Sequence, residues 1–321
     1  NEAMVFTPDV AEELGRVSTL VTHFGARAPD DLVESVLADV EIIVGQTAMG
    51  KDRLDRAPKL KAILNVKANW EPNIDYAECQ RRGIHVLSAA PAMAPAVAEY
   101  CLGQAIALAR DLPAGDRLFR AGEEKYGIGG NGRAYSLYDA PVGLIGYGNL
   151  GRALAPLLKP FGCGIAVHDP WLSDRYLETQ GVAPASLEEV LTQSRFLFIL
   201  AGVTSENEGF LDRPKLAQIP EDASVILGSR AEVVEFDAFL EMAGEGRFRA
   251  AVDVFPEEPV PADAASRKTP NVLFSAHLAG GLEKLLFRRL RGRNQPRATL
   301  RRSPSPAQRA EMRAAAAEAN S

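Results

Sequence analysis

Short apolar runs alternate with amphipathic segments along most of the chain. In the first 110 residues, the apolar runs predict four strands, at 18–24, 40–46, 59–66 and 83–89. Amphipathic segments predict helices at 30–38, at 74–82 and at 95–110, the last with Pro95 at its first position. Short strands that alternate with helices predict a parallel sheet covered by helices on both faces.

A second alternation follows a glycine-rich stretch, 111–141, for which the pattern predicts irregular structure. Six apolar runs predict strands at 142–146, 164–169, 195–200, 223–229, 248–255 and 272–276. Between them, Ser186 and Glu189 have the spacing of a capping box at the start of a helix over 186–193. The chain is therefore predicted to be an α/β protein of two domains, divided at 110/111, which suits its 321 residues.

A glycine motif follows the first strand of the second alternation directly. Gly146, Gly148 and Gly151 form the pattern G-x-G-x-x-G, and the third glycine opens an apolar helical segment. The first glycine allows a tight turn, the second lets a pyrophosphate approach the backbone, and the third lets the helix pack closely. A helix N-terminus also favours the negative charge of phosphate. This strand–turn–helix context predicts a dinucleotide site.

Asp169 ends the next predicted strand, 18 residues beyond Gly151. A carboxylate at this place accepts hydrogen bonds from ribose hydroxyls and repels a 2′-phosphate, so it favours NAD over NADP. Arg175 lies six residues further on and keeps NADP open as the alternative.

Three polar stretches come at the predicted carboxyl ends of later strands. They are "LGSRAE" with Arg230, "VDVFPEEP" with Asp253 and Glu258, and "SAHLAGG" with His277. Ligands of open α/β sheets bind at the carboxyl ends of strands. Singly, each residue has a structural alternative: a packed core histidine, a surface ion pair or an exposed loop acid. Together and in this order they favour a catalytic site.

An arginine, then D-V-F-x-x-E-P, then H-x-x-G, all downstream of a dinucleotide motif, resembles the D-isomer-specific 2-hydroxyacid dehydrogenase family. This family includes phosphoglycerate dehydrogenases and glyoxylate/hydroxypyruvate reductases, and the resemblance covers roughly 40–287. It implies two Rossmann-like or flavodoxin-like domains, with the cofactor domain inserted in the substrate domain. The substrate domain would comprise 1–110 and 284–321, and the NAD-binding domain 111–283. The resemblance also implies a homodimer, with 111–141 as the arm of contact.

The same resemblance assigns roles in the interconversion of a D-2-hydroxy acid and a 2-oxo acid. His277 would exchange the proton of the hydroxyl, Glu258 would orient and charge its ring, and Arg230 would hold the substrate carboxylate. Formate dehydrogenases of the family carry an amide where Glu258 stands, so the acid favours alcohol and ketone chemistry. Asp253 would accept from the nicotinamide carboxamide. The further cofactor contacts implied are Tyr147, Asn149, Leu150, Thr204, Ser229 and Gly280.

The turn after the third predicted strand departs from the family. Lys67, Ala68 and Asn69 stand where a glycine-rich turn usually binds the substrate carboxylate, so they become the candidate substrate-binding residues. Lys67 has the alternative of a simply solvated side chain. The departure leaves the choice of 2-hydroxy acid open. The N-terminal and C-terminal segments also differ from the family pattern, and they keep a second function open, a non-catalytic NAD-binding regulator or pseudoenzyme of the same fold.

Composition limits the partners. The net charge is −6, although the segment from Arg288 to Ser321 holds nine Arg against two Glu. The remaining chain is therefore acidic and gives no support for nucleic-acid binding. The basic segment is predicted to be disordered from about residue 292. Three scattered cysteines predict a cytoplasmic protein without a cysteine metal site, and no apolar run suggests a membrane span.

Overall fold

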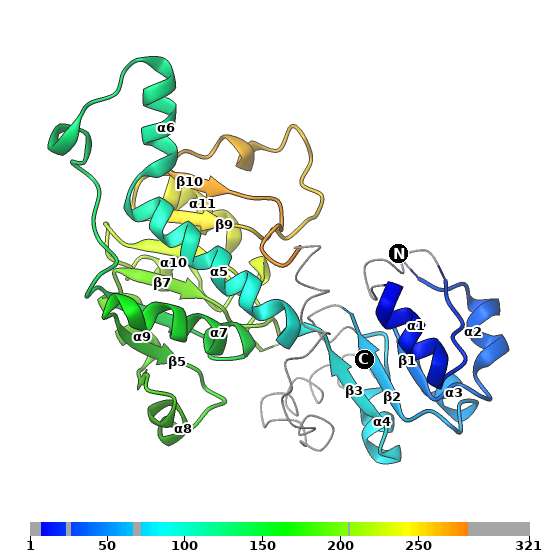
Figure 1. The fold of residues 1–321 in the computed structure, drawn as a ribbon. Helices are drawn as coiled ribbons and strands as arrows, with labels where there is room; N and C mark the ends of the chain where they lie inside the picture. Colours follow the sequence, from blue (N-terminus) through cyan, green and yellow to red (C-terminus); the bar gives the residue numbers. More distant parts are fainter. Residues whose placement is uncertain (1–7, 24–26, 67–71, 205, 282–321) are drawn as a thin grey trace. The chain divides into compact units, whose positions relative to one another are not determined.

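The computed structural model describes residues 8–23, 27–66, 72–204 and 206–281. They divide into two compact units, one up to Met93 and one from Ala94 to Gly281 (Figure 1). The division falls within the first turns of helix α5 (Ala90–Ala109), between Met93 and Ala94, whereas the sequence placed the boundary after this helix. The reason is packing, because α5 buries apolar side chains in the core of the second unit. The predicted return of 284–321 to the first domain lies outside the described residues.

The first unit contains a three-stranded parallel sheet in the order β1-β2-β3. Its strands and helices are α1 (Pro8–Val17), α2 (Asp30–Val36), β1 (Ile42–Val44), α3 (Lys51–Asp55), β2 (Ala62–Asn65), α4 (Tyr76–Arg82) and β3 (His85–Ser88). Val33, Leu54, Ile63, Tyr76 and Cys79 share one buried cluster, which joins the helices to the sheet. Three of the four strands predicted in this half are confirmed.

The predicted strand at 18–24 is wrong for the residues that the structure describes. Residues 18–23 have no strand structure and follow directly on α1. Leu20 and Val21, the large apolar residues among 18–23, are 41% and 56% exposed and so bury little surface. A strand needs a buried face to be specified, and these two side chains do not provide one.

The second unit contains a seven-stranded sheet in the order β10-β9-β8-β7-β4-β5-β6, with every pair parallel. The strands are β4 (Pro141–Ile145), β5 (Gly164–His168), β6 (Ala183–Pro184), β7 (Phe196–Ile199), β8 (Ser224–Leu227), β9 (Arg249–Val252) and β10 (Val272–Phe274). All six predicted strands are confirmed, five within narrower bounds and β4 one residue earlier than predicted. The two-residue β6 was not predicted, because two residues show no periodicity.

Two apolar cores cover the two faces of this sheet. On β7, Phe196 and Phe198 belong to one core, while Leu197 and Ile199 belong to the other. The first core also contains side chains of α5, α7 (Asn149–Leu158) and α8 (Asp174–Thr179). The second contains side chains of α9 (Leu187–Gln193), α10 (Arg213–Leu216) and α11 (Phe236–Gly244). Burial on both faces explains why the central strands are mostly apolar, without a polar residue at every second position. Short 3₁₀ turns complete the unit: η2 (Gly127–Gly130), η3 (Lys159–Phe161), η4 (Ala231–Val233) and η5 (Ala265–Lys268).

Helix α5 begins earlier than predicted, whereas the predicted start of α9 is confirmed. The helix predicted at 95–110 begins at Ala90, so Pro95 lies inside α5 and not at its first position. By length and composition α5 could cross a membrane, a test that the core helix of a soluble protein also passes. Its buried residues belong to the core of the second unit, which accounts for its apolar character. The capping box of Ser186 and Glu189 at α9 is confirmed.

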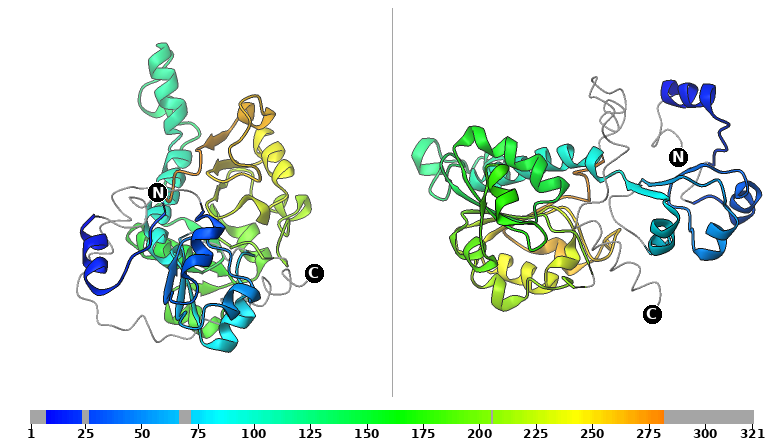
Figure 2. Two further views of the ribbon diagram at one scale, coloured as in Figure 1. Left: turned by 90° about the vertical axis from the view of Figure 1, so that its right-hand side faces the viewer. Right: turned by 90° about the horizontal axis from the view of Figure 1, so that it is seen from below.

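The stretch predicted to be irregular, 111–141, begins with a helix. It is α6 (Leu112–Ala121), which stands away from the sheet in Figure 1 and in the left view of Figure 2. None of its residues is buried, and Phe119 is 64% exposed. The glycines that suggested irregular structure instead end this helix, at Gly122, and form the 3₁₀ turn over Gly127–Gly130.

Candidate active site

The sheet order of the second unit places a change of chain direction at β4. From β4 the chain proceeds outward through β5 and β6 on one side, and through β7 to β10 on the other. The carboxyl ends of such a pair of strands form the crevice in which open α/β sheets bind ligands. All of the predicted cofactor and catalytic residues of this unit follow the carboxyl ends of its strands.

The glycine motif lies between β4 and α7, as predicted. Gly146 has a φ of +93°, and a Cβ on it would lie 2.8 Å from the backbone of Ala201. A Cβ on Gly151 would lie 2.8 Å from the carbonyl oxygen of Gly146. These two positions require glycine for the turn and for the packing of α7.

Gly148 has a different environment. A Cβ on it would meet no atom within 4 Å, although this residue is the N-cap of α7 and no side chain caps the helix. The open space therefore lies beside the first, unbonded N–H groups of a ten-residue helix. A pyrophosphate fits this place, because it needs close approach to backbone and a positive helix end. The neighbouring Tyr147, Asn149 and Leu150 complete the turn.

Asp169 follows β5, and its carboxylate is hydrogen-bonded to the glycine turn after β4 and to its own loop. Its Oδ2 accepts from the backbone N–H of Tyr147 at 2.8 Å, and its Oδ1 accepts from that of Trp171 at 3.0 Å. The side chain is only partly buried. Each carboxylate oxygen can accept more than one hydrogen bond, so both retain capacity for a ribose hydroxyl.

Hydrogen bonds also hold the loops that follow β7 and β8. Asn207 accepts from the backbone N–H of Thr204 at 2.7 Å and donates to the carbonyl of Gly202 at 2.7 Å. Ser229 Oγ donates to the carbonyl of Ala201 at 2.6 Å. These bonds fix the loop edges on which Thr204 and Ser229 were predicted to meet the cofactor.

His277 and Glu258 form a hydrogen-bonded pair. The distance from His277 Nδ1 to Glu258 Oε2 is 2.7 Å, and the side chains are 45% and 35% exposed. The other carboxylate oxygen accepts from the backbone N–H of Phe255 at 3.0 Å. The pair is thus oriented through Nδ1, which leaves the opposite ring nitrogen, Nε2, to face a reacting group.

Glu258 is ionised at neutral pH. Burial acts to raise its pKa, but the hydrogen bonds from His277 and Phe255 and the charges of His277 and Arg230 outweigh it, so the pKa lies below its usual 4.5. A carboxylate beside the ring stabilises the protonated imidazole. Arg230 follows β8, and its Nη1 donates to the carbonyl of Ser229 at 2.7 Å. The structure therefore pairs Glu258 with His277, and the charge of Arg230 acts on the Glu258 carboxylate.

Asp253 is 2% exposed and holds the loop that carries His277. Its Oδ1 accepts from Ser275 Oγ at 2.5 Å and from Leu278 N at 2.9 Å, and its Oδ2 accepts from Ala279 N at 3.0 Å. Its backbone carbonyl accepts from His277 N at 2.8 Å. The Asp253 carboxylate, which was predicted to accept from the nicotinamide carboxamide, thus accepts hydrogen bonds from the loop that carries His277. Gly280 follows this loop, and a Cβ on it would lie 3.7 Å from Val97.

The sequence reading missed two side chains of this site, Ser275 and Gln104, which lie in one hydrogen-bonded chain with Asp253. A signal for Gln104 was available, since it is a polar residue within the apolar run "CLGQAIALA". Lys67, Ala68 and Asn69, the predicted substrate-binding residues, lie outside the described residues. Among the residues that are described, none forms a cluster able to hold a metal ion.

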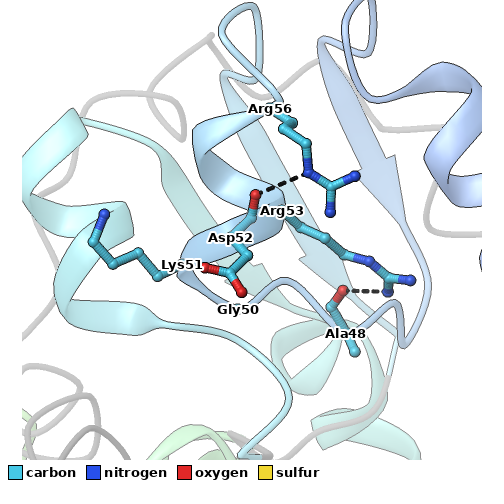
Figure 3. Close-up of a pocket in the computed structure, with 6 residues that line it drawn as sticks. All are labelled: Ala48, Gly50, Lys51, Asp52, Arg53 and Arg56. Atoms are coloured by element: carbon cyan, nitrogen blue, oxygen red, sulfur yellow. Dashed lines mark hydrogen bonds between the residues drawn. The ribbon is translucent and has the colours of Figure 1, made fainter.

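A hollow of about 460 Å³ lies in the first unit, and none of the predicted site residues is among those that line it. It is lined by Ala48, Gly50, Lys51, Asp52, Arg53 and Arg56 (Figure 3). Arg53 donates to the carbonyl of Ala48 and to the carboxylates of Asp30 and Glu34. Because this guanidinium is already satisfied by acids of the same unit, the hollow does not indicate an anion site.

Residues 102–279 match the family model described as "D-isomer specific 2-hydroxyacid dehydrogenase, NAD binding domain". The chain belongs to the D-isomer-specific 2-hydroxyacid dehydrogenase family. The matched region contains the glycine motif and all three catalytic candidates, Arg230, Glu258 and His277.

The sequence identity between this chain and individual members of the D-isomer-specific 2-hydroxyacid dehydrogenase family is low to moderate. The chain is 28% identical over 281 residues to D-3-phosphoglycerate dehydrogenase of Methanocaldococcus jannaschii, covering 86% of this chain and 51% of that protein. It is 29% identical over 236 residues to glyoxylate reductase of Pyrococcus furiosus, covering 70% of each. The crystal structure of a phosphoglycerate oxidoreductase from Rhizobium etli is similar with a TM-score of 0.77 at 37% identity, covering 88% of this chain and 89% of that one. The chain spans about half the length of the first of these relatives.

The glycine turn generates a prediction that separates binding from folding. Gly148→Ala places a methyl group in open space, so thermal stability should stay within about 2 °C of the wild type while NADH binding weakens by about 10-fold or more. Gly151→Ala is the matched control, because its methyl group meets the turn itself and should lower both. Calorimetric titration and thermal unfolding measure the two effects. Unchanged NADH affinity in Gly148→Ala would contradict this reading of the turn.

Proposed function

We propose that the protein is an NAD-dependent oxidoreductase that interconverts a D-2-hydroxy acid and the corresponding 2-oxo acid. The observation that carries the proposal is the 2.7 Å contact between His277 Nδ1 and Glu258, at the carboxyl edge of an NAD-binding sheet. A histidine oriented by an ionised acid can exchange a proton at neutral pH, which is what alcohol and ketone chemistry requires.

When bound, NAD supplies the hydride chemistry at its nicotinamide ring. The chain's own residues perform the rest. His277, protonated, donates from Nε2 to the carbonyl oxygen as negative charge develops there, and in the oxidative direction it takes the proton back. Glu258 holds the ring through Nδ1 and stabilises the imidazolium. Arg230 binds the substrate carboxylate with its planar fork of donors, which places the 2-oxo group next to Nε2.

The first unit is proposed as the substrate domain, with Lys67, Ala68 and Asn69 contributing to the binding of the carboxylate. Two relatives are named for small acid substrates, one as a D-3-phosphoglycerate dehydrogenase and the other as a glyoxylate reductase. We therefore propose a small 2-oxo acid as substrate. The three described cysteines are free, which fits a cytoplasmic enzyme.

Oxidation of NADH in the presence of a panel of 2-oxo acids tests the proposed function. Glyoxylate, hydroxypyruvate, pyruvate and bulkier 2-oxo acids form the panel, each with NADH and with NADPH. At least one acid should be reduced, and NADH should be preferred because Asp169 faces the ribose site. Binding of NADH without turnover on any acid would support the alternative, a non-catalytic NAD-binding regulator. Equal or faster turnover with NADPH would contradict the role of Asp169.

The paired residues make a sharper prediction. His277→Ala should bind NADH normally and lose turnover by ~10²–10⁴-fold, the usual contribution of a general acid. Reduction needs the protonated imidazole, so activity falls as pH rises through its titration. Removing the charge of Glu258 disfavours that cation, so the reductive profile of Glu258→Gln should fall at lower pH than that of the wild type.

The control for both variants is thermal stability. A histidine that only packs at a strand end predicts lower stability for His277→Ala, together with a Glu258→Gln profile that does not move. Normal turnover in both variants would contradict the catalytic role of His277 and support a structural one.

We further propose a homodimer that uses the arm formed by α6 and the following turn. Leu112, Phe119, Tyr126 and Ile128 are between 55% and 94% exposed, more apolar surface than a lone helix usually leaves in water. Sedimentation at micromolar concentration should give a dimer, and Phe119→Glu should shift it toward the monomer. A wild-type protein that sediments as a monomer would refute the arm as an interface.

A further inference from the structure

Three side chains of the second unit form a hydrogen-bonded chain that ends at the catalytic loop. Gln104 lies on α5, is 5% exposed, and donates from Nε2 to Ser275 Oγ at 3.3 Å. Ser275 in turn donates to Asp253 Oδ1 at 2.5 Å. Because the amide donates to the hydroxyl oxygen, the single proton of Ser275 has to point to Asp253.

Gln104 is an energetically costly residue at this place. Its Oε1 is buried, and no residue in the described part of the chain donates to it. An unsatisfied buried polar group costs about 1–3 kcal/mol, whereas a leucine would fill a similar volume without that cost. The neighbouring buried residues of α5 are Cys101, Ala105, Leu108 and Ala109, which are apolar as a core helix requires. Packing alone therefore gives no reason for an amide at position 104.

Asp253 links Ser275 to the backbone of the loop that carries His277. The same Oδ1 that accepts from Ser275 also accepts from Leu278 N, and the backbone carbonyl of Asp253 accepts from His277 N. His277 has a φ of 52°, in the left-handed region that costs a non-glycine residue free energy. The bonds around Asp253 hold this conformation, which directs the imidazole to Glu258.

We propose that Gln104 is a positioning residue of the dehydrogenase reaction. It orients Ser275, Ser275 fixes the carboxylate of Asp253, and the carboxylate fixes the backbone at Leu278 and Ala279. The His277 ring is thereby kept against Glu258. The inference rests on the proposed function for its kinetic consequence, although the coupling of Gln104 to the loop can be measured without any turnover.

Gln104→Leu is the variant that tests the proposal. It should be as stable as the wild type or more so, because it removes an unsatisfied buried amide. Its NADH affinity should be unchanged within about twofold, while reductive kcat falls by about 10-fold. Its reductive pH profile should also fall at lower pH than the wild type's, since a less well held imidazole gains less from Glu258.

Two further variants separate positioning from a general disturbance of α5. In a double-mutant cycle, Gln104→Leu should add little to Ser275→Ala, because both act through the same hydroxyl. Cys101→Ala is the matched control, one turn earlier on the same buried face of α5. It should lower stability through lost packing and leave the pH profile in place. Additive effects, or an equal shift of the profile in Cys101→Ala, would overturn the proposal.

Amide hydrogen exchange keeps the proposal testable if the protein proves to have no turnover. The amides of Leu278 and Ala279, which donate to Asp253, should exchange faster in Gln104→Leu than in the wild type. In Cys101→Ala their rates relative to the rest of the domain should be unchanged. Identical exchange of these two amides in the wild type and in Gln104→Leu would refute the role of Gln104, whatever the outcome of the activity assay.

Discussion

The hydrogen bond between His277 Nδ1 and Glu258 Oε2 is the interaction on which the proposed chemistry of this site depends. In the proposed reaction it has two effects. It presents a negative charge to the imidazole, which favours the protonated form, and it leaves Nε2 as the nitrogen that would meet the substrate. Glu258 can do this because it is ionised at neutral pH, its pKa held below the usual value by His277, Phe255 and Arg230 against the opposing effect of burial. The rest of the second unit provides the support for this pair.

That support comes mainly from Asp253. Both the histidine and the acid stand in loops beyond the last strands of the sheet, where loops alone would leave them free to move. Asp253 directly follows β9, and its buried carboxylate accepts from three groups of the loop after β10. These hydrogen bonds, made to a carboxylate next to the end of a buried strand, maintain a conformation of His277 that is unfavourable by itself.

Most of this site could be predicted from the sequence, because each part is a local pattern. The glycine turn follows a strand directly, Asp169 ends the next one, and Arg230, Glu258 and His277 come at strand ends that a parallel sheet brings to one edge. Contacts between distant parts of the chain could not be predicted in this way. Gln104 and Ser275 are 171 positions apart, and no periodicity connects them.

The fold shows the same limit. In the predicted strand at 18–24, the described apolar residues Leu20 and Val21 are exposed, and α6 was not predicted because of the glycines that end it. Lys67, Ala68 and Asn69, the proposed substrate-binding residues, lie outside the described residues. Local sequence patterns thus predicted the candidate cofactor and catalytic residues, while tertiary contacts decide how those side chains are held.

The tautomer of His277 tests the central claim most directly. A neutral histidine in water carries its proton mainly on Nε2, but a ring that donates from Nδ1 to Glu258 must carry it on Nδ1. Nitrogen-15 correlation spectra of the imidazole, recorded above its titration and assigned with His277→Ala, distinguish the two forms. The account predicts an Nδ1–H signal with a bare Nε2 in the wild type and its loss in Glu258→Gln. An Nε2–H tautomer in the wild type would contradict it.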